Sequence, residues 1–144
     1  MNDSERLRET VETFCHFIEQ LPAAAQAEQE WGPKEVLAHL VFYHEGFVNQ
    51  IEARLADRPF DLPKGRFSDL NAQIAAASRD VPVDELVRRL RAAGMRLCDL
   101  YAAHDPTQIM VQIKQGSKVW PLADLLPAEE GHVRGHWQRL RQQF

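Results

Sequence analysis

The feature that most constrains this chain is a series of long segments in which apolar residues recur at helical spacing. Apolar side chains at every third or fourth position form a stripe along one face of a helix, and that stripe must pack against another element. The first such segment, Ser4 to Gln20, carries Leu7, Val11, Phe14 and Ile18 on its stripe. Asp3 or Ser4 can cap its start, and Pro22 ends it, so we predict a helix here.

The same reasoning predicts further helices along the chain. They run from the Trp31-Gly32-Pro33 start to just before Asp57, over Phe67 to Ser78, over Val83 to Ala103, and over Pro121 to Gln143. Residues 23 to 30 read as a linker. We expect Pro127 to kink the last helix or to mark a fresh start. Between Asp105 and Trp120 the sequence fits a small hairpin and an extended loop equally well.

Length and composition indicate one folded domain. The 144 residues fit a single unit, and 44% hydrophobic with 26% charged residues is typical of a globular protein. Four main helices with one short extra helix make a bundle the natural architecture. We therefore predict an all-α four-helix bundle over residues 1–144, with a hairpin before the last helix as the only candidate sheet.

The charge pattern argues against several classes of partner. The formal net charge is −4, which does not suggest nucleic acid or an anionic membrane as a partner. Arg88, Arg89, Arg91 and Arg96 lie opposite an apolar stripe, as expected for a solvated helix face. Cys15 and Cys98 each fall on an apolar stripe and are expected to be buried thiols. No signal-like or membrane-length apolar run is present, so we expect a cytoplasmic protein.

The last predicted helix contains the candidate functional residues. Its apolar stripe passes through Glu129, His132 and His136, so three titratable groups point toward the core. Burying a polar group without a partner costs roughly 2–7 kcal/mol, so something must satisfy all three. The two histidines are four residues apart and can occupy two sites on one metal ion. Two hydrogen-bonded structural histidines remain the alternative, because the spacing alone is only moderately specific.

A third histidine ligand must come from another helix. The helix that begins near Trp31 offers two, and a helical wheel places His44 at the centre of its apolar face and His39 on the flank beside Tyr43. Periodicity alone therefore favours His44 as the ligand. Either histidine can instead lie at a helix–helix seam without metal. Tyr43 can line a pocket or pack, and we expect it to pack.

A family resemblance favours His39. The segment Trp31-Gly-Pro-Lys-Glu-Val-Leu-Ala-His39-Leu40 resembles the W-[ST]-x-x-[ED]-[VL]-[LV]-x-H-L motif of the DinB/YfiT superfamily. Glu-Gly-His132-Val-Arg-Gly-His136 resembles its terminal HxxxH pair, and the middle of the chain is similar to the ClbS/DfsB and mycothiol-dependent maleylpyruvate isomerase branches. The similarity spans about Trp31 to Leu140. It implies a four-helix bundle with His39, His132 and His136 as metal ligands.

The resemblance also implies a function. It suggests a divalent-metal-dependent enzyme that acts by thiol transfer, isomerisation or hydrolysis on a small molecule such as a low-molecular-weight thiol. Zinc or nickel is the first expectation for the ion, with iron or manganese as alternatives. Glu129 is the candidate catalytic residue, either as a general base or as an acceptor for an imidazole N–H. The alternative is a stress or self-resistance protein that binds or sequesters a ligand without catalysis. We also expect a homodimer.

Overall fold

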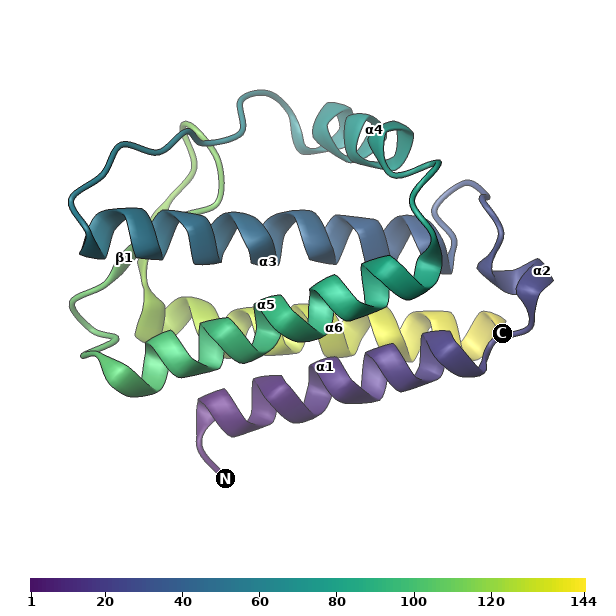
Figure 1. The fold of residues 1–144 in the computed structure, drawn as a ribbon, viewed down its shortest axis with the longest axis horizontal. Coiled ribbons are helices and arrows are strands. Elements are labelled where there is room, and N and C mark those ends of the chain that lie inside the picture. The colour runs from purple at the N-terminus through teal and green to yellow at the C-terminus, as the bar shows by residue number, and fades with distance from the viewer.

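The computed structural model describes residues 1–144 and contains four long helices that pack as a bundle (Figure 1). They are α1 (Asp3–Gln20), α3 (Pro33–Leu55), α5 (Val83–Ala103) and α6 (Leu122–Gln143). α1 and α6 run in one direction, and α3 and α5 run in the opposite one. Because α3 and α5 run in the same direction, the chain needs the long crossover that joins the end of one to the start of the other. The predicted all-α bundle is confirmed.

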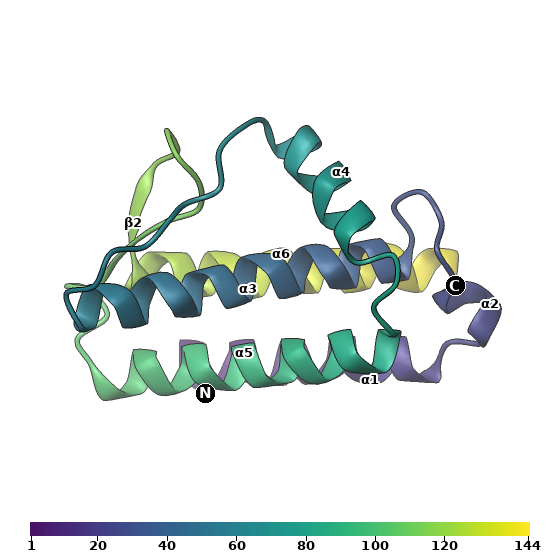
Figure 2. The same cartoon turned by 45° about the horizontal axis from the view of Figure 1, so that its top comes forward.

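Four short elements connect or cover the long helices. α2 (Ala23–Gln26) is a single turn in the stretch predicted as a linker, and α4 (Phe67–Ala77) lies over α3 in the crossover (Figure 2). β1 (Met110–Gln112) and β2 (Val119–Pro121) pair antiparallel, with Val111 opposite Trp120. The segment before α6 is therefore a hairpin rather than an open loop.

Two details of the helices, the cap of α1 and the course of α6 at Pro127, go beyond or differ from the prediction. Asn2, rather than Asp3 or Ser4, caps α1, because its side chain accepts the Glu5 N–H while the Glu5 carboxylate accepts the Asn2 N–H. α6 continues through Pro127 without a fresh start. Proline removes only one backbone N–H here, and the buried Leu125 and Leu126 fix this turn of the helix against the core.

The apolar core lies mainly where α1 packs on α5 and α6 and where α3 packs on α5. α1 and α5 approach closely at Gly94, where an added Cβ would lie 3.3 Å from a methyl carbon of Val11. Cys15 and Cys98 are buried free thiols, as predicted, and burial raises the pKa of Cys15 to about 12. By contrast, α3 and α6 share few contacts, so these two helices are held together mainly by their neighbours.

The arginines of α5 form ion pairs on the surface. Arg89 pairs with Glu45 on α3, while Arg91 bridges Glu12 and Glu19 on α1. The basic stripe is therefore largely neutralised by carboxylates on neighbouring helices, as predicted for a solvated face. None of the helices is long and apolar enough to cross a membrane.

Candidate metal centre

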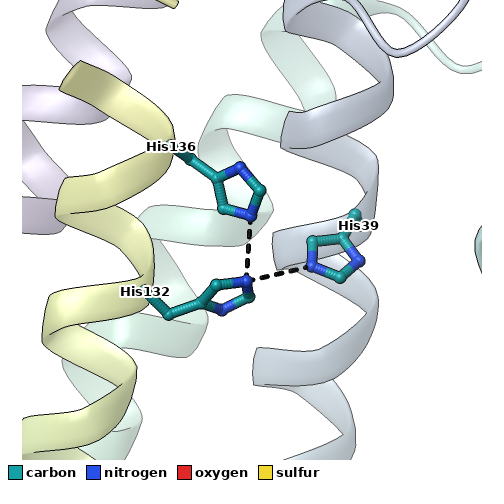
Figure 3. Close-up of side chains that lie close together, drawn as sticks. All are labelled: His39, His132 and His136. Atoms are coloured by element: carbon teal, nitrogen blue, oxygen red, sulfur yellow. Dashed lines mark hydrogen bonds between the residues drawn. The ribbon is translucent and has the colours of Figure 1, made fainter. Parts of the chain in front are cut away.

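Three histidine side chains converge between α3 and α6. His39 comes from the second turn of α3, and His132 and His136 project from successive turns of α6 (Figure 3). The Nε2 atom of His132 lies 2.9 Å from Nε2 of His136 and 3.5 Å from Nε2 of His39. One nitrogen from each ring lies within 4.8 Å of the others. The structure thus brings together the three histidines proposed as ligands, whereas metal binding itself stays a prediction.

The outer nitrogens of two rings are held by hydrogen-bond acceptors. Nδ1 of His39 donates to Oδ1 of Asn71 at 2.9 Å, and Nδ1 of His132 donates to Oε1 of Glu129 at 3.0 Å. A neutral imidazole that donates from Nδ1 carries its lone pair on Nε2. Both rings therefore direct a lone pair toward the centre of the cluster, which is the state in which imidazole binds a metal ion.

The third ring is held differently. Nδ1 of His136 lies 2.5 Å from Nη2 of Arg139, and a guanidinium can only donate. Nδ1 of His136 must therefore accept, and its Nε2–H donates to Nε2 of His132. Binding an ion through Nε2 of His136 requires that this proton leave Nε2 and that Arg139 move away from Nδ1.

The electrostatics of the cluster favour neutral His39 and His136 and an ionised Glu129, while His132 holds a proton more readily than a free imidazole does. Burial lowers the pKa of His39, and burial with the nearby His132 and His39 lowers the pKa of His136 to about 3. The hydrogen bond to Glu129 raises the pKa of the more exposed His132. Burial alone would raise the pKa of Glu129, but hydrogen bonds from His132 and His44 outweigh it and lower that pKa to about 2. The donor set fits a divalent cation, since it combines neutral imidazoles with one supporting negative charge.

His44 lies outside the cluster. It is fully buried, and its Nε2 donates to Oε1 of Glu129 at 2.9 Å, while its Nδ1 has no hydrogen-bond partner. The helical wheel correctly placed His44 at the centre of the apolar face. That central position directs the ring into the core and away from the point where His39 meets α6. Depth on the apolar face therefore does not identify the candidate ligand.

Trp31 covers one side of the cluster. Its ring centroid lies 5.5 Å from that of His39 and 6.1 Å from that of His136, both in edge-on geometry. The backbone of Trp31 has φ of 53°, which is rare for a bulky residue and costs of order 1–3 kcal/mol. The turn before α3 thus holds an unfavourable conformation that places the indole against two of the three rings.

A cavity of about 350 Å³ opens on another side of the cluster. Eight residues line it: His39, Tyr43, Phe47, Phe67, Asn71, Ile113, Glu129 and His132. Tyr43 is buried, as the expectation of packing requires, but it also forms part of the cavity wall. Sequence reasoning did not identify Asn71 as a site residue, and only its place in a loosely matching segment could have pointed to it. The cavity gives a small molecule access to the histidines.

Comparison with known proteins identifies the family. The family model described as mycothiol maleylpyruvate isomerase N-terminal domain matches residues 4–127. The chain belongs to this DinB-like family. The match includes His39 but ends before His132 and His136, and the grouping of the three histidines rests on the geometry of α3 and α6.

A solved structure supports the fold of the family member. The chain superposes on an uncharacterized protein from Clostridium difficile 630 with a TM-score of 0.72 and 12% sequence identity. The alignment covers 97% of this chain and 94% of that one. At this identity the likeness shows the fold alone. No curated protein matches the sequence.

Proposed function

We propose that His39, His132 and His136 bind one divalent metal ion and that the protein is a metal-dependent enzyme acting on a small molecule, a low-molecular-weight thiol in the first instance. The observation that carries the proposal is the orientation of the rings. Two Nε2 lone pairs already point to a common centre because Asn71 and Glu129 hold the opposite nitrogens. Buried structural histidines also need hydrogen-bond partners, but nothing in that role requires the free nitrogens of two rings on different helices to face one point.

The donor set leaves room for chemistry. Three imidazoles do not complete the coordination shell of a divalent ion, so one or more positions are left for water or substrate. A bound ion would supply a lowered pKa for a coordinated water or thiol. Imidazole ligands suit zinc and nickel, and iron and manganese are the alternatives. The reaction is then thiol transfer, isomerisation or hydrolysis.

We assign Glu129 to the orientation of His132 rather than to general base catalysis. A carboxylate with a pKa of about 2 is a weak base at neutral pH, and its Oε1 already accepts hydrogen bonds from His132 and His44. Glu129 is therefore a positioning residue in this proposal. Asn71 plays the same part for His39.

The test combines metal analysis with an activity screen. Purified protein is treated with a chelator, reloaded with zinc, nickel, iron or manganese, and assayed for bound metal by elemental analysis. Each loaded form is then screened for conjugation of low-molecular-weight thiols and for ester hydrolysis, with His132→Ala as the matched control. Failure of the wild-type protein to retain any of the four metals would overturn the proposal. Metal binding without turnover would favour the sequestering alternative.

A further inference from the structure

The cavity beside the histidine cluster has two chemically distinct ends. The polar end is formed by His39, Asn71, Glu129 and His132, and the apolar end by Tyr43, Phe47, Phe67 and Ile113. A volume of about 350 Å³ is at the small end of the range for ligand pockets, roughly 300–1,000 Å³. This cavity accommodates a single ring with a short substituent rather than a large cosubstrate.

The hydroxyl of Tyr43 is the polar group of the apolar end that lacks a partner. Tyr43 is 5% exposed, and its hydroxyl makes no hydrogen bond within the protein. Burial raises the pKa of Tyr43, so the hydroxyl is protonated at neutral pH and can donate. Buried hydroxyls in folded proteins are nearly always hydrogen-bonded, and an unpaired one therefore calls for an explanation. A ligand acceptor in the cavity would supply the missing partner.

The charges around the cavity argue against an anionic group at the apolar end. No lysine or arginine lines the cavity, whereas the carboxyl group of Glu129 does. Lys114 lies over the Phe67 ring, 5.1 Å from its centroid, but is not part of the lining. A carboxylate placed between Phe47 and Ile113 would lose its hydration without gaining a counter-charge, which is unfavourable.

Phe67 forms the exposed part of this wall. It is the first residue of α4, it is 45% exposed, and its ring centroid lies 6.3 Å from that of Tyr43. Because the Tyr43 hydroxyl is buried, a ligand reaches it only when a neighbouring side chain moves, and we assign that movement to Phe67, the exposed neighbour. Phe47, in contrast, is buried in the middle of α3 and forms a fixed wall.

We propose that the cavity binds the neutral, apolar body of the substrate, about the size of one substituted aromatic ring, and that the Tyr43 hydroxyl positions it by donating to a carbonyl or ether oxygen. This inference rests on the proposed function, because it makes the cavity the place where a substrate meets the histidine cluster. Tyr43 is thereby a specificity-determining residue for a neutral acceptor group.

The test uses three probes of similar size on chelator-treated, metal-free protein: acetophenone, ethylbenzene and benzoate. Binding is measured by calorimetry and by ligand-observed NMR. We expect the wild-type protein to bind acetophenone more tightly than ethylbenzene, and benzoate least. Tyr43→Phe should weaken acetophenone binding by about fivefold, the effect of one hydrogen bond, and leave ethylbenzene unchanged. Tyr101→Phe, the matched control on α5, should leave all three unchanged.

Three results would overturn the proposal. The first is the absence of saturable binding of acetophenone to the wild-type protein, and the second is unchanged acetophenone binding in Tyr43→Phe. The third is tighter binding of benzoate than of acetophenone, which would show that the cavity does not prefer a neutral ligand. Ile113→Trp, which fills the cavity, should abolish binding of all probes, with circular dichroism to check folding. Because the protein is metal-free, failure of metal binding by the histidines leaves this test intact and is detected separately.

Discussion

The contact between α1 and α5 and the contact between α3 and α6 are built in opposite ways. The first seam is apolar and closely packed, whereas the second is polar and sparsely packed. At the first, small and branched apolar residues allow close approach, and Gly94 packs against Val11. At the second, the two helices share few contacts and face each other through imidazoles and a buried carboxylate. Of these two seams, the first contributes more to stability, because burial of apolar surface is the dominant favourable term in folding.

The comparison shows how a small bundle can hold a polar cluster in its interior. α3 and α6 need not attract each other strongly, since α3 packs on α5, α5 on α1, and α1 on α6. The α3–α6 seam can therefore carry side chains that would be unfavourable in a close-packed core. Substitutions at the two seams should accordingly affect different properties of the protein.

The largest expected effect separates the two histidines of α3. His39→Ala should weaken zinc binding by at least about 100-fold, because it removes a ligand, and should change stability little. His44→Ala should keep zinc binding but destabilise the metal-free protein by about 2–3 kcal/mol, since it deletes a buried ring bonded to Glu129. Calorimetric titration with zinc and urea denaturation measure the two effects. Loss of zinc binding in His44→Ala alone would show that periodicity identified the ligand.

A substitution at the tight seam should act in the opposite sense. Gly94→Val places side-chain atoms against Val11 and should destabilise the protein by about 1–3 kcal/mol, with no change in zinc affinity. Gly46→Ala is the control, because no atom lies within 4 Å of its added Cβ, and it should stabilise α3 by about 0.5–1 kcal/mol. Equal stability of the two variants would contradict the close approach of α1 and α5.

The pH dependence of zinc binding should show that a single proton, the one on His132, competes with the metal ion. The pKa of His39 and that of His136 are lowered, so both rings lose their protons at lower pH than a free imidazole does, whereas the hydrogen bond to Glu129 raises the pKa of His132 above its ordinary value of about 6.5. Zinc affinity should therefore fall by about tenfold per pH unit as pH drops below the pKa of His132. Calorimetry from pH 8 to pH 5.5 tests this slope. A hundredfold or thousandfold loss per unit would mean that two or three histidines titrate together.

The smallest predicted effect concerns Arg139. Arg139→Met removes the donor that holds Nδ1 of His136 as an acceptor, so zinc affinity should rise several-fold, by roughly 1 kcal/mol. Long-range ¹H–¹⁵N NMR of the metal-free wild-type protein should show the proton of His136 on Nε2. Arg141→Met removes the same charge from the same helix without touching a histidine, so it controls for charge alone. An equal gain in both variants would exclude a role for the tautomer.

The sequence predicted the helices because their apolar stripes and proline breaks are local signals. Val83 to Ala103 agrees with α5 at both ends, and only caps and single turns such as Asn2 and α2 differ. His39 was reached through the family motif, since its flank position on the helical wheel gave no reason to prefer it. Family membership and the fold are thus confirmed, while the homodimer stays a prediction.

Other parts of the site could not be predicted because they depend on packing between distant segments. Asn71 reaches His39 only because α4 lies over α3. The positive φ of Trp31 depends on the turn that precedes α3 and has no residue-type signal, since glycine is the usual occupant of that region. The contact of Arg139 with His136 depends on a rotamer, which spacing alone does not determine.

The spacing of the histidines along the chain has a mechanical consequence. His39 and His132 are 93 positions apart, and they lie on two long helices that share few contacts. An ion bound by both would cross-link the chain across a loop of that length, and a permanent link of this kind stabilises a fold by about 4–5 kcal/mol in the chain-entropy treatment. Without the ion, the α3–α6 seam should be the first part of the bundle to open and exchange its amide hydrogens. A bound metal ion would then hold together two helices that otherwise contact each other little, and its removal would free them.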